Sequence, residues 1–343
     1  MTAAVELDSV CIVFGGAPER ALPLMDAGES REKIQAETGQ ILGVHDCSLQ
    51  VGEGEIVVLM GLSGSGKSTL LRAVNGLNKV ARGTARVDDG KKMVDITRAD
   101  AATLRFFRTQ RIAMVFQQFG LLPWRTVADN IAFGLEVAGA DAGRRRESVA
   151  RQLEMVNLQG WGECAVHELS GGMQQRVGLA RAFATESPIL LMDEPFSALD
   201  PLIRVRLQDE LLDLQTRLRR TILFVSHDLD EALKIGNRIV IMEGGRIVQT
   251  GAPEDIVLHP ATDYVADFVA HMNPLKTLRA ASVMRDSPPP ADENCIRAEA
   301  DAPLMEILRA KRDGDGPVYV RRDGEWAGVI DDDDIYDALL RRQ

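Results

Sequence analysis

The stretch GLSGSGKST, residues 61–69, is the part of the sequence with the clearest chemistry. It matches the spacing G-x-x-x-x-G-K-[ST], with Lys67 and Ser68 at its end. Glycines let backbone N–H groups approach phosphate oxygens, the lysine adds a full positive charge, and the serine hydroxyl can bind Mg²⁺. The pattern predicts a loop that holds a nucleoside triphosphate. Its predicted nucleotide-binding residues are Gly61, Ser63, Gly64, Ser65, Gly66, Lys67, Ser68 and Thr69.

Two carboxylates follow an apolar run in PILLMDEP, where Asp193 and Glu194 are adjacent. Ligands of open α/β sheets lie beyond the carboxyl ends of the strands. We predict that Asp193 binds Mg²⁺ together with Ser68, and that Glu194 is the general base for an attacking water. Adjacent strand residues face opposite ways, so this assignment requires the alternation to relax at the strand end, near Pro195.

Two more apolar runs end in polar side chains. TILFVSHD ends near His227, which we expect to donate to the terminal phosphate and to orient Glu194 and water. MVFQQ places Gln117 at the end of another run, where its amide can contact Mg²⁺ or water. Gln118 remains an alternative, because periodicity does not separate the two glutamines.

These residues require a sheet whose strand ends meet. Residues 5–14 are expected to form an opening strand, and the apolar run 56–60 has counterparts in IAMVFQ, PILLMDEP, TILFVSHD and RIVIMEGGRIVQTG. Their length and β-branching favour buried parallel strands, and helical patterns separate most of them. The alternation predicts an α/β fold with a mostly parallel sheet. Between Ala128 and about Gly160 the pattern predicts a helical insertion.

Composition excludes several classes of protein. The chain has 343 residues, of which 45% are hydrophobic and 27% charged, as in soluble globular proteins of one or two domains. We see neither an apolar run of about 18 to 20 residues nor a signal-peptide pattern, so we expect a cytoplasmic chain. The net charge of −11 argues against nucleic acid as a partner. The 4 cysteines lack CxxC spacing, which disfavours a zinc site or a disulfide framework.

The motifs GLSGSGKST, VFQQ, LSGGMQQR, LLMDEPFSALD and FVSHD, in this order, resemble those of the ATP-binding subunits of ABC transporters, over about residues 5–275. The signature of that family is usually written LSGGQ; Met173 departs from it, although quaternary-amine importers often carry methionine here. In that family two ATPase domains pack head to tail, and each signature closes over ATP held by the other copy. A signature therefore needs no lysine of its own. The resemblance implies that ATP in the partner copy is contacted by Ser170, Gly171, Gly172 and Met173. It also implies that Asp200 links the two sites.

The resemblance has further implications. The fold would be a P-loop ABC ATPase over residues 5–272, with a helical subdomain at about 120–180. Phe14 falls where the family stacks an aromatic ring on adenine; a buried core phenylalanine is the alternative. The loop after Gln117 would receive a coupling helix from a transmembrane permease; ordinary packing is the alternative. The chain would then lie peripherally on the cytoplasmic face of the inner membrane, with a periplasmic or extracellular solute-binding protein as an indirect partner.

A long segment between Phe14 and Gly43, the LSGGM form and a small C-terminal extension resemble the glycine betaine/proline and choline importers. ATP hydrolysis would then drive uptake of a quaternary amine that never touches this chain. One alternative is a soluble ABC ATPase acting on DNA, ribosomes or Fe–S assembly, which is disfavoured by the single cassette without a long coiled-coil insertion. Another is a regulator without turnover, which is disfavoured by Glu194 and His227.

The C-terminal residues 277–343 resemble one CBS-type half module, a small α+β unit with a helix, the strands GPVYVRR and EWAGVID, and a second helix. CBS domains often bind adenine nucleotides through a Ser/Thr and an Asp after the second strand. The matching positions here are Asp331 and Asp334, and a carboxylate in place of a hydroxyl would repel phosphate. We therefore expect no nucleotide here. Related tails are associated with sensing ionic strength; a solvated acidic turn is the alternative.

Overall fold

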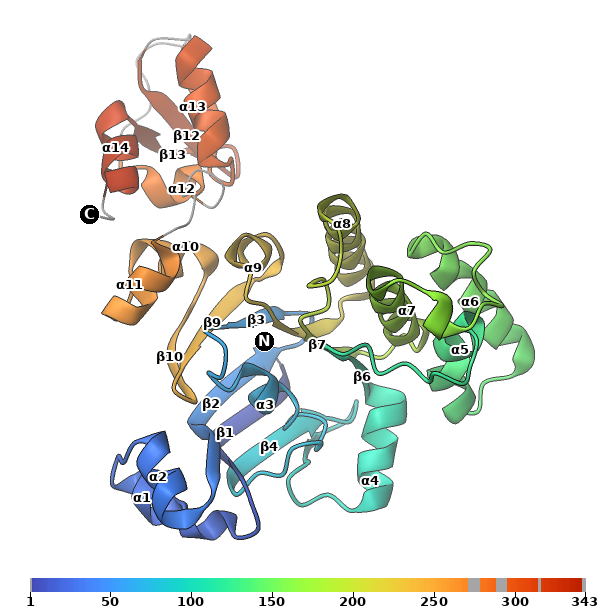
Figure 1. The fold of residues 1–343 in the computed structure, drawn as a ribbon. Helices are drawn as coiled ribbons and strands as arrows, with labels where there is room; N and C mark the ends of the chain where they lie inside the picture. The colour runs from blue at the N-terminus through green and yellow to red at the C-terminus, as the bar shows by residue number, and fades with distance from the viewer. Residues whose placement is uncertain (1, 271–277, 288–294, 314–315, 341–343) are drawn as a thin grey trace. The chain divides into compact units, whose positions relative to one another are not determined.

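The computed structural model describes residues 2–270, 278–287, 295–313 and 316–340 (Figure 1). The chain forms two compact units, Met1–His227 with Met242–Ile247, and Asp228–Ile241 with Val248–Gln343. Every residue predicted to act on the nucleotide belongs to the first unit. The predicted boundary between residues 272 and 277 lies outside the described residues.

The first unit contains a sheet with the order β2-β1-β4-β5. Its strands are β1 (Ala3–Phe14), β2 (Ile41–Gly52), β4 (Arg82–Asp88) and β5 (Met93–Asp95). The opening strand expected over residues 5–14 is confirmed, and it pairs antiparallel with both β2 and β4.

Three short helices lie between β1 and β2 in the sequence. They are η1 (Pro18–Arg20), α1 (Leu22–Asp26) and α2 (Arg31–Thr38). The Ser30 hydroxyl accepts from the Lys33 N–H at the start of α2, and Gly39 ends the helix in the left-handed region at φ 67°. Met25 and Ile34 anchor the segment, because they are buried in a small core with apolar residues of β1 and β2.

The second sheet has the order β10-β9-β3-β8-β7-β6. Its strands are β3 (Ile56–Met60), β6 (Ile112–Val115), β7 (Ile189–Asp193), β8 (Thr221–Val225), β9 (Arg238–Glu243) and β10 (Arg246–Gly251). Strands β3, β8, β7 and β6 run parallel, as predicted. β3, β7 and β8 are buried along their whole length, which explains their continuous apolar runs. The carboxyl ends of these parallel strands share one edge, where the site assembles (Figure 1).

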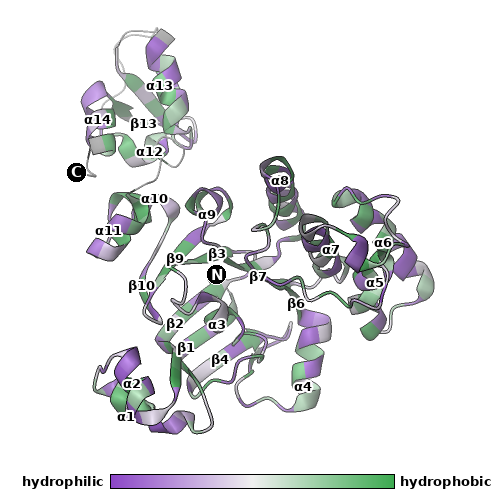
Figure 2. Ribbon diagram, in the orientation of Figure 1, coloured by the Kyte–Doolittle hydropathy of each residue, from purple (hydrophilic) through white to green (hydrophobic). Residues whose placement is uncertain are grey.

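The predicted helical insertion is present. Helix α5 (Val127–Val137) and helix α6 (Ala142–Met155) pack with α7 (Gly171–Ala184). The other helical elements of this unit are α3 (Lys67–Leu71), α4 (Ala101–Phe106), the π-helical turn η2 (Phe107–Arg111), η3 (Val166–Glu168) and α8 (Pro201–Leu218). The helices mix hydrophilic and hydrophobic residues (Figure 2), as expected for helices that cover a core on one side.

The second unit carries a three-stranded sheet with the order β11-β12-β13. Its elements are α9 (Leu229–Ile235), α10 (Pro253–Leu258), α11 (Asp263–Val269), α12 (Ala280–Val283), β11 (Ile296–Glu299), α13 (Leu304–Asp313), β12 (Val318–Arg322), β13 (Glu325–Ile330) and α14 (Asp332–Leu340). The predicted helix, strand, strand and helix correspond to α13, β12, β13 and α14. The sequence analysis missed β11, which pairs parallel with β12.

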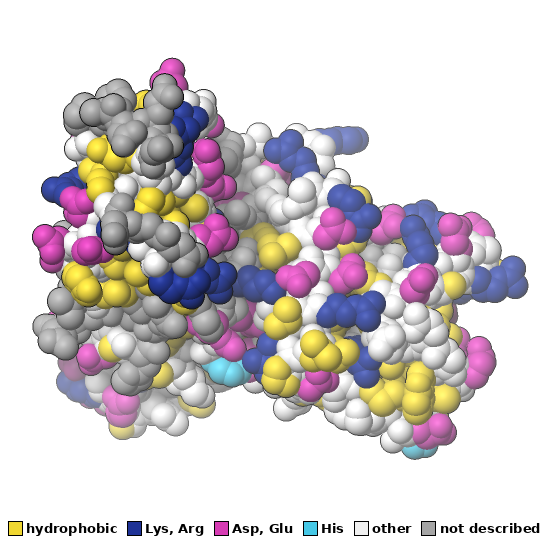
Figure 3. All heavy atoms as spheres, turned by 90° about the horizontal axis from the view of Figure 1, so that it is seen from above, with side chains coloured by type: hydrophobic (Ala, Val, Ile, Leu, Met, Phe, Trp, Pro, Cys, Tyr) yellow, Lys and Arg dark blue, Asp and Glu magenta, His cyan; other side chains and the backbone are white. Residues whose placement is uncertain are grey.

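No helix within the described ranges is long and apolar enough to cross a bilayer. Acidic and basic side chains are interspersed over the face drawn in Figure 3.

Candidate nucleotide-binding site

The loop of residues 61–66 connects β3 to α3 and depends on glycine at both ends. Gly61 has φ 137°, and a Cβ there would lie 2.1 Å from the Met242 carbonyl oxygen. Gly66 has φ 99°, and a Cβ there would lie 2.8 Å from the Gly43 carbonyl oxygen. Only glycine tolerates both the left-handed backbone and this close approach. The predicted order of strand, glycine loop and helix is therefore confirmed.

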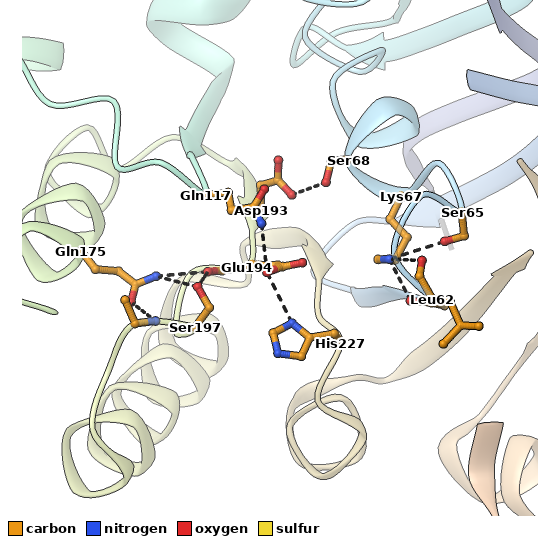
Figure 4. A network of polar contacts seen from close by, with 12 residues as sticks. Leu62, Ser65, Lys67, Ser68, Gln117, Gln175, Asp193, Glu194, Ser197 and His227 are labelled. Carbon is orange, nitrogen blue, oxygen red and sulfur yellow. Dashed lines mark hydrogen bonds and ion pairs between the residues drawn. The ribbon is translucent and has the colours of Figure 1, made fainter. Parts of the chain in front are cut away.

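Lys67 is the first residue of α3, and its side chain folds back into the loop (Figure 4). Its Nζ donates to the Gly61 and Leu62 carbonyl oxygens at 2.8 and 2.9 Å, and it lies 3.4 Å from the Ser65 hydroxyl. The residue is only 7% exposed. Burial holds the pKa of Lys67 below its usual range, although the carboxylates of Glu194 and Asp193 oppose that shift.

Asp193 and Ser68 meet at the end of β7. The Asp193 side chain is fully buried; its Oδ1 accepts from the Ser68 hydroxyl at 2.6 Å, and its Oδ2 pairs with Arg72 Nη2 at 2.8 Å. A hydroxyl beside a carboxylate is an oxygen donor set that suits Mg²⁺. Among the described residues no group of three His, Cys, Asp or Glu could hold a metal alone. The pair fits an ion that takes its other ligands from phosphate and water.

Glu194 reaches the same edge as Asp193 because its backbone leaves the strand conformation. Its φ is 48°, and its N–H donates to the Val225 carbonyl at 3.1 Å. A non-glycine residue in the left-handed region is strained by roughly 1 to 3 kcal/mol. The sequence analysis required the alternation of side chains to break down at the end of this strand. The left-handed backbone of Glu194 is where it does so.

The Glu194 carboxylate contacts two predicted partners (Figure 4). Its Oε2 accepts from the Gln117 amide at 3.2 Å and lies 3.4 Å from His227 Nδ1. Gln117 follows β6 and His227 follows β8, so residues from separate parts of the chain converge. This geometry also separates the two glutamines, because Gln117 is the one that contacts Glu194.

Gln175 is a buried residue of α7 that the sequence analysis missed. Its Nε2 donates to the Glu194 carbonyl at 3.1 Å, and its Oε1 accepts from the Ala198 N–H at 2.9 Å. It thus connects the helix that begins at Gly171 with the strained turn at Glu194. Its position within LSGGMQQR is a signal, but spacing alone does not distinguish it from Gln174.

A cavity of about 650 Å³ lies over the loop, and its volume suits a nucleotide. The predicted residues that line it are Phe14, Ser63, Gly64, Gly66, Lys67, Ser68, Thr69, Gln117, Glu194 and His227. Arg31, Ile41, Leu42 and Gly43 also line it, and the sequence analysis missed them. Phe14 is 40% exposed on this cavity, which does not fit a buried core residue.

The signature residues do not line this cavity. Ser170 caps α7 by accepting from the Met173 N–H at 3.3 Å, and Gly171 and Gly172 form the first turn of the helix. Asp200 caps α8 in the same way, accepting from the Ile203 N–H at 3.0 Å. Ser170 and Asp200 are both exposed. The roles that the resemblance implies, phosphate binding by Ser170 and linkage of two sites by Asp200, therefore require a nucleotide outside the cavity of their own chain.

A family model described as ABC transporter matches residues 44–197. The glycine betaine/proline betaine transport ATP-binding protein ProV of Escherichia coli is 44% identical over 345 residues, which cover 100% of this chain and 84% of ProV. The chain belongs to the ATP-binding subunits of ABC transporters. The glycine betaine/carnitine transport ATP-binding protein GbuA of Listeria monocytogenes is 43% identical, over 95% of this chain and 80% of GbuA.

Two further matches extend the comparison of this ABC subunit. The trimethylamine N-oxide transport ATP-binding protein TmoW of Ruegeria pomeroyi is 42% identical over 96% of this chain and 95% of TmoW. The ATP-binding cassette MJ0796, in a dimeric post-hydrolysis state bound to ADP and Pi, is 29% identical with a TM-score of 0.63. That match covers 73% of this chain and 98% of MJ0796. The predicted ABC ATPase fold and ATP-hydrolysing activity are confirmed, as is the likeness to quaternary-amine importers.

Proposed function

We propose that this ABC ATPase drives the uptake of a quaternary amine, choline or glycine betaine/proline betaine, through a membrane permease. The match to ProV over the whole chain, C-terminal unit included, carries this proposal. The names of ProV, GbuA and TmoW refer to transport of glycine betaine and proline betaine, of glycine betaine and carnitine, and of trimethylamine N-oxide. In all of these solutes the nitrogen carries methyl groups and no hydrogen. The solute class therefore rests on similarity, whereas the ATPase chemistry also rests on the geometry of the site.

The first half of the proposed mechanism is binding of ATP. Phe14 stacks on the adenine, and the amides of the 61–66 loop surround the phosphates. The ammonium of Lys67 turns from the Gly61 and Leu62 carbonyls toward the β and γ phosphates. The Ser68 hydroxyl, Asp193 and the Gln117 amide oxygen would hold Mg²⁺, which would supply positive charge beside the phosphate oxygens.

The second half is hydrolysis. Water attacks the γ-phosphorus, its proton passes to the Glu194 carboxylate, and the bond from phosphorus to the ADP oxygen breaks. His227 orients that carboxylate through the 3.4 Å contact and donates from its other ring nitrogen to the γ-phosphate. Gln117 donates to the same carboxylate oxygen, Oε2, so two side chains hold the base before the nucleotide arrives.

A second copy of the chain completes each site in this proposal. Ser170 and the N–H groups at the start of α7 close over the γ-phosphate bound by the partner. The dimeric MJ0796 cassette supports this arrangement. ATP then favours the closed dimer because it contacts both copies, and ADP does not. Gln175 would transmit closure, since it connects the signature helix to Glu194.

The permease would dock beside the Gln117 loop. A mostly apolar groove of about 310 Å³ there is lined by residues that include Phe116, Gly120, Leu122, Phe133 and Val137. Phe116 lines the groove while its neighbour Gln117 contacts the catalytic carboxylate. A coupling helix seated in the groove could therefore shift Gln117 directly. Docking of this kind would keep the chain peripheral, on the cytoplasmic face of the membrane.

Reconstitution tests the proposed function. The chain is co-purified with its permease, placed in vesicles with a solute-binding protein, and supplied with choline, glycine betaine, proline betaine and unrelated solutes. We expect a quaternary amine to stimulate ATP hydrolysis and to accumulate only with ATP. ATP hydrolysis that responds to no quaternary amine, or that responds to DNA or ribosomes instead, would refute the transport assignment and leave the ATPase assignment intact.

A further inference from the structure

Arg31 is the first residue of α2 and reaches from the segment between β1 and β2 to the nucleotide loop. Its Nη1 donates to the Gly64 carbonyl at 2.8 Å, and its Nη2 donates to the Gly43 carbonyl at 2.8 Å. One guanidinium therefore ties α2 to both the phosphate-binding loop and strand β2. Arg31 also lines the nucleotide cavity, together with Phe14 and residues of the loop.

The Arg31 side chain is tightly packed, and one of its donors is buried without a partner among the described residues. A Cβ on Gly245 would lie 2.5 Å from Nη2, so the guanidinium packs directly against that glycine. Its Nε is buried and has no hydrogen-bond partner among the described residues. An unsatisfied buried donor of a charged group is unfavourable, because it loses its hydration and no hydrogen bond replaces it. Lys33, two residues later, makes a surface ion pair with Glu29. This contrast argues that Arg31 has a role beyond stabilising α2.

The bond to Gly64 fixes part of the nucleotide loop. The carbonyl and the following N–H of a trans peptide point in opposite directions. Arg31 holds the Gly64 carbonyl, and the Ser65 N–H on the other side of that peptide donates to the Leu62 carbonyl at 3.2 Å. The peptide is thus held from both sides. A loop fixed in this way loses less conformational entropy when a triphosphate binds.

We propose that Arg31 is a positioning residue of the ATP site, which braces the Gly64 peptide and adds a positive charge beside the triphosphate. The segment between β1 and β2 is then part of the nucleotide-binding apparatus. This inference rests on the ATP-hydrolysing part of the proposed function and is independent of the transported solute.

Kinetics of full-length variants test the role. In Arg31→Ala we expect the KM for ATP and the Kd for a non-hydrolysable ATP analogue to rise by at least about tenfold. We expect kcat to change much less, because the described hydrogen bonds of the Arg31 side chain go to Gly64 and Gly43 and not to Glu194. Lys33→Ala is the matched control: it removes one positive charge from the same helix and should leave KM and Kd unchanged.

Two more variants and a rescue separate bracing from structural damage. Arg31→Lys keeps the charge and Arg31→Gln keeps a donor, so each should retain part of the affinity. Millimolar methylguanidinium should restore ATP affinity to Arg31→Ala and leave the wild type unchanged. A wild-type KM in Arg31→Ala would overturn the proposal. The proposal would also be overturned if methylguanidinium did not restore ATP affinity and if the loss of ATP affinity in the three variants increased as their melting temperatures fell, because the loss would then reflect structural damage. A wild type without ATPase activity would instead refute the ATPase assignment.

Discussion

Two pairs of carboxylates lie at or just after strand ends in this protein, and their surroundings differ. Asp193 is the last residue of β7 and Glu194 follows it; Glu194 lines a cavity that Lys67 also lines. Asp331 and Asp334 follow β13, and both pair with Arg285, the latter at 3.2 Å from Nε. Each pair contacts an arginine, since Asp193 pairs with Arg72, but Glu194 contacts Gln117 and His227 instead and lines the nucleotide cavity.

The second pair also caps a helix. The Asp334 carboxylate accepts from the Asp331 N–H at 2.7 Å at the start of α14, as an acidic residue in the first turn often does. The expectation that these carboxylates repel phosphate stays a prediction, because their pairing with Arg285 offsets part of their negative charge. Within this comparison, the feature that marks Glu194 is that it lines a cavity together with Lys67.

The largest effect is expected at Glu194. In Glu194→Gln the general base is removed while the amide can still occupy the same space, so ATP hydrolysis should fall about 10² to 10⁴-fold. ATP should still bind, since the loop and Lys67 are unchanged. Phosphate release and analogue binding measure the two effects. A rate within tenfold of wild type would show that Glu194 is no more catalytic than the tail carboxylates.

Mixed dimers test whether a site needs two copies. Lys67→Ala and Ser170→Ala should each inactivate both sites of their own homodimer. Random mixing should make half of the dimers mixed, each with one intact site, and restore about a quarter of the wild-type rate if one site suffices. Steady-state ATPase assays on the mixture measure this. No recovery above the homodimers would contradict the shared site.

Most of the site could be predicted because its residues follow apolar strands or occupy spaced motifs. Lys67, Asp193 and His227 have this property, and parallel strands bring their ends together. The left-handed φ of Glu194 could not be predicted, since pattern reasoning gives no backbone angle for a non-glycine residue. The side chain of Gln175 could not be distinguished from that of Gln174, because the choice depends on which face of α7 meets Glu194.

Arg31 was missed for a different reason. It lies in a polar helical segment whose sequence carries no chemical motif, and its role depends on contacts with Gly43 and Gly64, which are distant in the sequence. Strand β11 was missed in the same way, because only 4 residues pair with β12 and their burial is partial. Both features depend on tertiary contacts rather than on local patterns.

The pH dependence of stability provides a third test. Burial lowers the pKa of Lys67 from 10.5, so between the lowered value and 10.5 the unfolded chain binds more protons than the folded chain. The free energy of unfolding of the wild type should therefore rise with pH in that window, relative to Lys67→Met. Denaturant titrations of both proteins across the alkaline range measure the difference. A difference that falls with pH would mean that Lys67 is stabilised as a cation in the free protein.

The smallest effect is expected at Arg285. Its side chain is 57% exposed, and exposed ion pairs contribute only about 0 to 1 kcal/mol, even where two carboxylates share one guanidinium. Arg285→Ala should lower the stability of the C-terminal unit by no more than that and leave the KM for ATP unchanged. Denaturant unfolding and ATPase kinetics measure the two, with Arg322→Ala, also on this unit, as the control. The comparison would be contradicted if Arg285→Ala bound a second ATP per chain that the wild type does not bind. That result would mean that the arginine masks a nucleotide site and that the two carboxylates do not exclude phosphate.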